Sequence, residues 1–191
     1  MSRARSIWAL VLAACLLVLP AVAQDSSKKT EALTPPPSPS QAILEQWNEI
    51  GRKLVAMAED VPEDKYDYKP HPDSRSLVAQ LLHVSASMYY FTDVAQGRKV
   101  RYADDPSRDQ LKTKVQVVAF VKKSVDDGAN LIKAKGDAGM AAVIQYPETN
   151  ERHRLSELAY SVIEHSGEHY GQLVVYYRIN GMVPPESRPK K

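Results

Sequence analysis

The sequence predicts an all-α protein, an up-down four-helix bundle with a longer connection between the third and fourth helices. Four stretches of roughly twenty residues or more place apolar side chains at steps of three and four, which is the period of one helix face. Prolines and glycines separate these stretches and end the predicted helices. Four amphipathic helices of similar length are typical of a four-helix bundle, whose core commonly contains metal sites on facing helices.

The first 23 residues resemble a secretory signal peptide. Arg3 and Arg5 give it a positive start, residues 7–19 form a short apolar core, and Ala21-Val22-Ala23 is a small-x-small cleavage site. The apolar core is too short to span a hydrocarbon layer of about 30 Å comfortably. We therefore expect cleavage after Ala23, a periplasmic or secreted mature protein, and no membrane anchor once the signal is removed.

Cys15 supports an alternative, a lipoprotein, because Leu12-Ala13-Ala14-Cys15 resembles a lipobox. The apolar run continues past Cys15, however, whereas a lipidated cysteine usually begins a polar stretch. Cleavage after Ala23 removes this single cysteine, so the mature chain has no disulfide and no thiol nucleophile. It also removes Arg3 and Arg5, which takes the formal net charge from +2 to zero. A neutral chain lacks the positive surface that nucleic acid binding needs.

Residues 24–40 are rich in proline and serine and predict an extended linker, because such a segment cannot bury a core. The bundle is expected over residues 41–185, followed by a frayed basic tail over residues 186–191. The first helix is predicted from Ser40, its N-cap, to Glu59. Its apolar stripe consists of Ile43, Trp47, Ile50, Leu54 and Met57.

The second helix is predicted from Asp73 or Ser74 to Ala95, and the third from Pro106-Ser107 to about Lys135, before Gly136. His83 lies on a polar row that borders the apolar face of the second helix, so its ring can point towards the other helices. The apolar stripes are Leu77, Leu81, Val84, Met88 and Phe91 in the second helix and Leu111, Val115, Val118, Val125 and Ile132 in the third.

Residues 136–154 connect the third and fourth helices and are the least regular part. The apolar run from Ala141 to Tyr146, closed by Pro147, fits either a strand-like flap or a packed loop, and periodicity does not decide between them. Two histidines are expected to be solvent-exposed: His71, which lies between two prolines, and His153, which lies between two arginines.

The fourth helix, predicted from Leu155 to Arg178, carries the strongest functional signal. His165 and His169 fall on its apolar face, where a core helix would carry Leu or Val. Residues four apart on a helix lie about 5–6 Å apart at Cβ, so the two imidazoles can converge on one cation, which for zinc lies about 2.0–2.1 Å from each nitrogen. The apolar positions of this face are Leu155, Leu158, Val162, Leu173 and Tyr176.

A metal site needs a third ligand, and His83 is the candidate. A buried polar group without a partner costs about 1–3 kcal/mol, and a shared cation removes that cost by bonding one nitrogen of each ring. Gln80 and Gln172, each three residues from a histidine, are candidates to orient the rings. Three protein ligands with open positions are typical of a catalytic metal site. Taken singly, each histidine also fits an ordinary hydrogen-bonded role in or beside the core.

Two motifs together carry a family resemblance. One is His165-x-x-x-His169-Tyr170-Gly171-Gln172-Leu173, followed by residues 177–181 and Pro184-Pro185, and the other is Leu77 to His83. They resemble the last and the second helix of DinB/YfiT-like proteins, over roughly residues 40–188. This resemblance implies a four-helix bundle, often dimeric, with a divalent metal held by His83, His165 and His169. Relatives include bacillithiol- and mycothiol-dependent transferases, but these thiols are cytosolic, so the export signal argues against thiol transfer.

The first functional hypothesis is therefore an exported hydrolase of a small-molecule substrate. Zn²⁺ or Ni²⁺ would polarise a substrate oxygen and lower the pKa of a bound water, and Glu168 is the nearest candidate base. Gly167 and Gly171 indicate close helix packing in preference to room for substrate. The alternatives are a non-catalytic metal or small-ligand binding protein and a structural homodimeric bundle. The peptidase motif H-x-x-E-H also matches residues 165–169, but it requires a distant carboxylate ligand and a mixed α/β scaffold.

Overall fold

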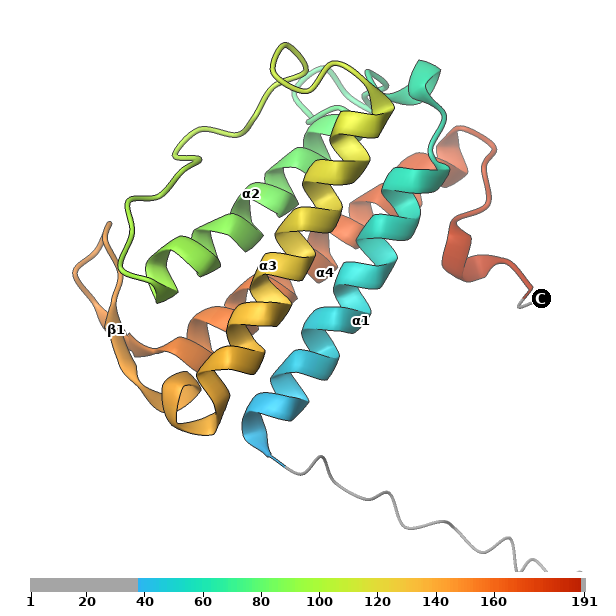
Figure 1. Cartoon of the computed structure of the whole chain (residues 1–191). Coiled ribbons are helices and arrows are strands. Elements are labelled where there is room, and N and C mark those ends of the chain that lie inside the picture. Colours follow the sequence, from blue (N-terminus) through green and yellow to red (C-terminus); the bar gives the residue numbers. More distant parts are fainter. Residues whose placement is uncertain (1–37, 190–191) are drawn as a thin grey trace, which may run out of the picture. The chain divides into compact units, whose positions relative to one another are not determined.

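The computed structural model describes residues 38–189 and consists of four long helices and one short hairpin (Figure 1). The helices are α1 (Pro39–Asp60), α2 (Leu77–Ala95), α3 (Lys114–Ala141) and α4 (Leu155–Ile179). The predicted four-helix bundle is confirmed. The predicted signal peptide with Cys15, the linker up to residue 37, and the last two residues of the tail lie outside the described residues.

Among residues 38–189, the structure has no helix with the length and apolar character that a membrane crossing requires.

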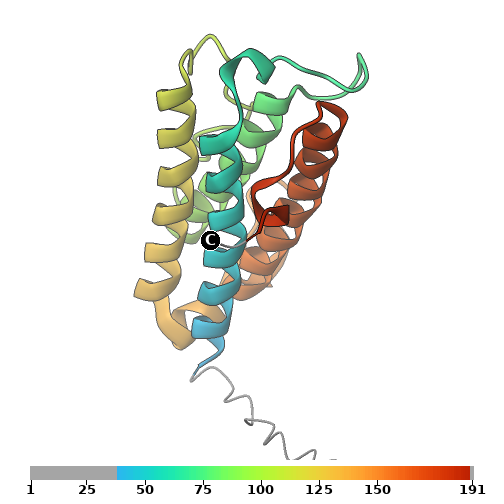
Figure 2. The same cartoon turned by 90° about the vertical axis from the view of Figure 1, so that its right-hand side faces the viewer.

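The helices run in an order other than strict alternation. α2 and α3 run in the same direction, opposite to α1 and α4, and each of α3 and α4 packs against both α1 and α2 (Figures 1 and 2). Two parallel neighbours need a connection that returns along the bundle, and residues 96–113 provide it. We call this segment the crossover. The predictions of up-down alternation and of the longest connection between the third and fourth helices were therefore wrong: the longest connection lies between α2 and α3, and the connection between α3 and α4 contains the hairpin.

The crossover is long because α3 begins at Lys114 instead of at Pro106-Ser107. Thr113 and Gln116 form a capping box: the Thr113 hydroxyl accepts from the Gln116 amide at 3.3 Å, and the Gln116 side chain accepts from the Thr113 amide at 3.0 Å. Residues after Pro106 form only one turn, closed by the Leu111 amide on the Ser107 carbonyl. The proline marked a turn, while the capping chemistry starts the helix.

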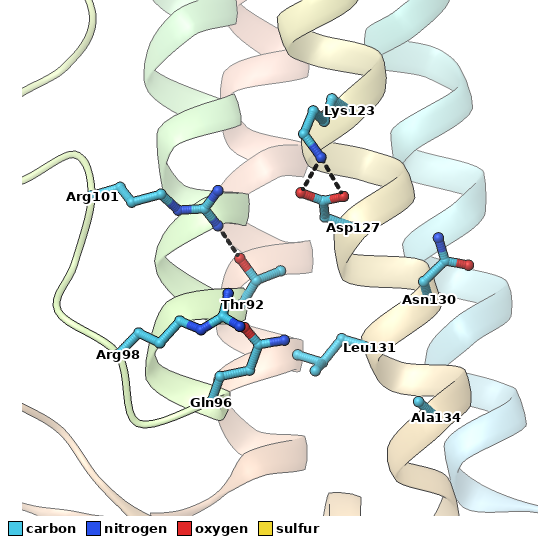
Figure 3. Close-up of a pocket in the computed structure, with 9 residues that line it drawn as sticks. All are labelled: Thr92, Gln96, Arg98, Arg101, Lys123, Asp127, Asn130, Leu131 and Ala134. Carbon is cyan, nitrogen blue, oxygen red and sulfur yellow. Dashed lines mark hydrogen bonds and ion pairs between the residues drawn. The ribbon is translucent and has the colours of Figure 1, made fainter.

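An ion pair between a buried carboxylate and a partly exposed arginine fastens the crossover to α2. Asp93 is 1% exposed and accepts hydrogen bonds from the Arg101 amide and from Arg101 Nε, both at 2.9 Å. Arg101 Nη2 also donates to the Thr92 hydroxyl at 2.9 Å (Figure 3). Because a buried carboxylate without a partner is strongly unfavourable, this pair holds the crossover in one position. Asp105, four residues further on, is thereby positioned beside α2.

The core forms where the apolar stripes meet. All the residues predicted for the apolar faces of α1, α2 and α4 are buried. In α3 the predicted face was wrong in part, because Val115 is 78% exposed while Val117 and Val121 are buried. Apolar residues cluster at the start of α3, so periodicity there did not identify which of them face inwards.

Trp47 shows how closely α1 and α3 approach. Its ring is fully buried, its Nε1 donates to the Val125 carbonyl at 2.9 Å, and its ring centroid lies 5.0 Å from that of Phe91. Gly128 makes this possible, since a Cβ at that position would overlap the Trp47 ring. A tryptophan from one helix therefore fills the gap that a glycine leaves in the other.

The connection between α3 and α4 forms a hairpin. Of the two structures left open by the sequence, a strand-like flap and a packed loop, it is therefore the flap. Strands β1 (Val143–Gln145) and β2 (Arg152–Arg154) pair antiparallel, with Ile144 opposite His153. The Tyr146 and His153 rings stack at 4.4 Å, so His153 is half-exposed rather than fully exposed as expected. The Tyr90 hydroxyl donates to Glu148 at 2.6 Å and ties the hairpin to α2.

The tail is ordered further than expected. Arg52 of α1 forms two hydrogen bonds of 2.7 Å with Glu186, and Arg188 donates to both oxygens of Asp60. The first part of the predicted frayed tail therefore folds back against α1 (Figure 2).

The tight fit at Gly128 predicts that Gly128→Ala destabilises the fold by about 1–3 kcal/mol, because overpacking forces the Trp47 ring to move. Gly171→Ala is the matched control in α4, where a Cβ meets nothing within 4 Å. It should stabilise by about 0.5–1 kcal/mol, because alanine has the higher helix propensity. Urea unfolding of both variants measures this, and equal effects of the same sign would contradict the packing described.

Candidate metal centre

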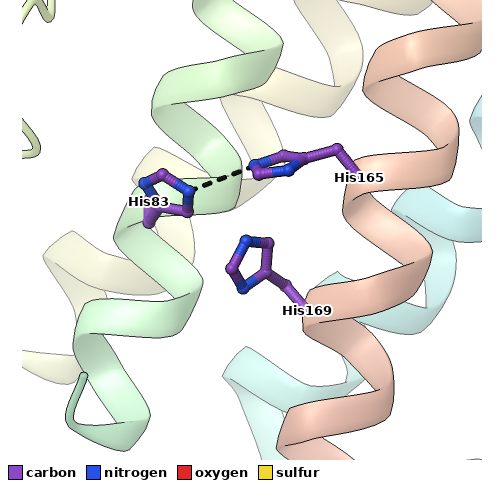
Figure 4. A group of neighbouring side chains, drawn as sticks. All are labelled: His83, His165 and His169. Atoms are coloured by element: carbon purple, nitrogen blue, oxygen red, sulfur yellow. Dashed lines mark hydrogen bonds between the residues drawn. The ribbon is translucent and has the colours of Figure 1, made fainter. Parts of the chain in front are cut away.

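Three histidines meet between α2 and α4. His83 comes from α2, and His165 and His169 come from successive turns of α4 (Figure 4). One ring nitrogen from each lies within 4.8 Å of the other two, and the Nε2 atoms of His83 and His165 are 3.1 Å apart. His169 is 7% exposed, and the other two are half-buried. The structure thus brings together the three predicted ligands.

A carboxylate from the crossover sets the proton position on His83. Its Nδ1 lies 2.8 and 2.9 Å from the two oxygens of Asp105. An ionised carboxylate only accepts hydrogen bonds, so Nδ1 carries the proton. In the neutral ring the lone pair then lies on Nε2, which faces the other histidines.

A chain of hydrogen-bonded amides and hydroxyls sets the proton position on His169. Its Nδ1 lies 2.6 Å from Gln80 Oε1. The Tyr176 hydroxyl donates to the Arg75 carbonyl at 3.1 Å, so it accepts from Gln80 Nε2, which also donates to Gln172 Oε1. The Gln80 amide is thereby oriented with its oxygen towards His169, whose Nδ1 must donate. Gln80 orients a ring as predicted, while Gln172 acts through Gln80.

Burial favours the neutral form of the two α4 histidines. Loss of solvent, followed by repulsion from His165 and His83, lowers the pKa of His169 to about 4. Burial, followed by repulsion from a protonated His83, also lowers the pKa of His165. Neutral imidazole is the form that binds a metal. At neutral pH, therefore, protons compete little for the nitrogens of His165 and His169.

The arrangement fits a divalent cation. With Nδ1 protonated on His83 and His169, both Nε2 lone pairs remain for the shared centre. Two neutral acceptors at 3.1 Å, as between His83 and His165, repel unless a proton or a cation lies between them. Two ligands of one zinc ion have a similar separation, since each bond is about 2.0–2.1 Å. The three-histidine site could therefore hold a metal ion, and imidazole ligands suit zinc and nickel.

Comparison with protein families identifies the chain. A model of the DinB superfamily matches residues 46–173, which include all three histidines. The chain belongs to the DinB superfamily. No curated protein sequence matches it.

Solved structures share this fold at low sequence identity. The DinB-like protein YjoA from Bacillus subtilis has a TM-score of 0.63 and 18% identity, over 78% of this chain and 99% of YjoA. A DinB-like protein from Bacillus cereus has a TM-score of 0.63 and 13% identity, over 75% of this chain and 93% of the other. YfiT from Bacillus subtilis, described as a probable metal-dependent hydrolase with an unusual four-helix bundle topology, has a TM-score of 0.59 and 15% identity, over 75% and 88% of the two chains.

Other predicted residues of this DinB chain lie away from the cluster. Glu168 is exposed on α4, and its role as a base stays a prediction. His71 is exposed, as expected. The packing interpretation of Gly167 and Gly171 was wrong, because a Cβ at either position meets nothing within 4 Å.

Asp105 is the residue that sequence reasoning missed. It lies 22 positions after His83 in a segment without helical periodicity, so no spacing rule connects the two. The crossover brings it to the histidines only in the folded chain. A carboxylate that orients a metal-binding histidine is a common arrangement.

Asp105→Ala should weaken Zn²⁺ binding by about 10- to 100-fold, because His83 loses the acceptor that orients its ring. Asp104→Ala is the matched control, since Asp104 is exposed and carries the same charge one position earlier. Competition against a fluorescent zinc chelator at pH 7 gives both dissociation constants. Equal dissociation constants for the two variants would remove Asp105 from the metal centre.

Proposed function

We propose that this DinB protein is a metal-dependent hydrolase in which His83, His165 and His169 hold Zn²⁺ or Ni²⁺. The observation that carries the proposal is the convergence of three ring nitrogens within 4.8 Å, while Asp105 and Gln80 occupy the outer nitrogens of His83 and His169. Three protein ligands are the number typical of catalytic zinc sites, whereas structural sites usually have four. The description of YfiT as a probable metal-dependent hydrolase supports the same chemistry.

A cation bound here would supply Lewis acidity, polarising a substrate carbonyl or phosphoryl oxygen and making a coordinated water more acidic. The chain's own residues orient and enclose the site. Asp105 and Gln80 hold the rings of His83 and His169, and α2, α4 and the crossover form the walls of the adjoining cavity.

Two carboxylates are candidates for the general base. Glu168 was predicted from the sequence, but its side chain is exposed on α4. Asp105 lines the cavity beside the histidines and already accepts a hydrogen bond from His83. Because a base must come within hydrogen-bond reach of the proton it removes, Asp105 is the better placed of the two. Accordingly, Glu168→Gln should leave most of the activity intact.

The zinc- or nickel-loaded protein should bind one equivalent of metal and hydrolyse members of a panel of esters, amides and phosphoesters. His169→Ala should abolish both stoichiometric binding and hydrolysis, because it removes a ligand. His153→Ala, which changes a histidine on the hairpin, should retain both. Metal analysis of the purified protein and initial rates measure the two properties.

These measurements also separate the alternatives. Stoichiometric metal without hydrolysis of any panel member would favour a binding protein. Absence of metal after reconstitution would favour a structural bundle whose histidines are satisfied by hydrogen bonds. Hydrolysis that survives His169→Ala would contradict the metal mechanism.

We further propose that the protein is exported and acts outside the cytosol. The charged start, apolar core and cleavage site of residues 1–23 support this, together with a mature chain that has no cysteine. Expressed at full length in a Gram-negative host, the protein should be recovered from the periplasm with Gln24 as its first residue. N-terminal sequencing tests this. An intact Met1, or a lipidated Cys15 in the membrane fraction, would overturn it.

A further inference from the structure

A cavity of about 490 Å³ adjoins the histidine cluster. His83 and His165 line it, whereas His169 lies behind them, so two of the three rings face its contents. This volume falls in the range of about 300–1,000 Å³ that is typical of small-molecule sites. The remaining lining residues are Ala86, Ser87 and Tyr90 of α2, Tyr102, Ala103 and Asp105 of the crossover, and Leu158, Ser161 and Val162 of α4.

The walls away from the histidines are apolar. Ala86, Leu158 and Val162 are buried core residues whose surfaces close the cavity from two helices. Tyr102 adds an aromatic face from the crossover, and its ring is held 5.4 Å from the rings of both Tyr89 and Phe120. The Ala86, Leu158 and Val162 side chains and the face of the Tyr102 ring offer contact area and no hydrogen bonds, so they favour hydrocarbon or aromatic groups.

Three of the four hydroxyl groups in the walls already donate to other parts of the chain. Ser87 Oγ donates to the His83 carbonyl at 3.2 Å, and Ser161 Oγ donates to the Glu157 carbonyl at 3.1 Å. The Tyr90 hydroxyl donates to Glu148. Besides the Tyr102 hydroxyl, the remaining polar groups are His83, His165 and Asp105, which lie together because His83 contacts both of the others.

The cavity has no positive side chain. Of its eleven lining residues, only Asp105 is ionised when the histidines are neutral, and Arg75 pairs with Asp105 from outside the lining at 3.3 Å. A charged phosphate or carboxylate at the apolar end would lose its hydration without gaining a cation, which is strongly unfavourable. In contrast, Arg98, Arg101 and Lys123 line a separate cavity of about 440 Å³ between α2 and α3 (Figure 3), which contains no histidine.

From this distribution we infer that the substrate is a carboxylic ester or amide whose uncharged, largely apolar acyl or alkyl group occupies this cavity, with its carbonyl at the histidine end. The inference rests on the proposed hydrolase function and specifies its substrate class. Substrates that carry a phosphate or carboxylate on the group at the apolar end are excluded as preferred substrates, because those walls offer no cation. Hydrolysis adds water across the acyl bond: the hydroxyl goes to the carbonyl carbon and the proton to the leaving alcohol or amine.

The first test uses the metal-free protein, so that it does not depend on activity. 4-Phenylbutanamide and 4-phenylbutanoate share one skeleton and differ in charge. The neutral amide should bind about tenfold more tightly, because burial of the carboxylate beside Asp105 is unfavourable. Backbone NMR titration should show the largest shift changes at Ala86 and Tyr102. Equal or tighter binding of the carboxylate would overturn the inference.

A matched pair of variants on α4 locates the site. Ser161→Trp fills the cavity and should weaken binding of the amide about tenfold, whereas Tyr160→Trp changes the exposed neighbour that does not line the cavity and should leave binding unchanged. Circular dichroism and zinc stoichiometry verify that both variants are folded. Unchanged binding in a folded Ser161→Trp variant would place the ligand elsewhere.

Metal-loaded protein separates the two proposals. It should hydrolyse p-nitrophenyl butyrate faster than p-nitrophenyl phosphate, and Ser161→Trp should slow the butyrate reaction more than that of p-nitrophenyl acetate. Binding of the amide without hydrolysis of any ester would reject the hydrolase function, but the preference of the cavity for uncharged ligands would stand. Preferred hydrolysis of the phosphate ester would reject the substrate class while preserving the hydrolase.

Discussion

The hydrogen bond between His83 Nδ1 and Asp105 connects the fold to the metal centre. It requires Asp105 to lie beside α2, and this position depends on the crossover. The crossover in turn is held by the ion pair of Arg101 with the buried Asp93. The parallel course of α2 and α3 makes such a returning segment necessary (Figure 1). Chain topology, one ion pair and the proton position on a histidine are therefore coupled.

Burial of His169 determines its protonation state. Removed from solvent, His169 has a pKa of about 4, so its ring is neutral at physiological pH. Its outer nitrogen is occupied through Gln80, and the inner nitrogen faces His83 and His165. An apolar bundle would ordinarily exclude such groups, because unpaired buried polar atoms are costly. A shared cation would account for their presence together.

Two cavities of similar volume differ in the charged side chains that line them. The one beside the histidines has apolar walls and a single carboxylate, and the one between α2 and α3 has three cationic side chains. The crossover contributes to both, through Tyr102 and Asp105 on one side and through Arg98 and Arg101 on the other. The crossover therefore contributes charged side chains to both cavities and an aromatic side chain to the one beside the histidines, in addition to the side chains of the helices.

The sequence by itself determined the four helices, most of the buried stripes and the three histidines. These follow from local periodicity, since residues three or four apart share a helix face whatever surrounds them. The same rule misplaced Val115 and the start of α3, where apolar residues crowd together and the capping chemistry lies at Thr113. Only the tertiary structure decided the direction of α3, the partner of His83 and the neutral walls beside it. Each of these joins residues from distant segments, and no local pattern encodes which side chains meet across a folded chain.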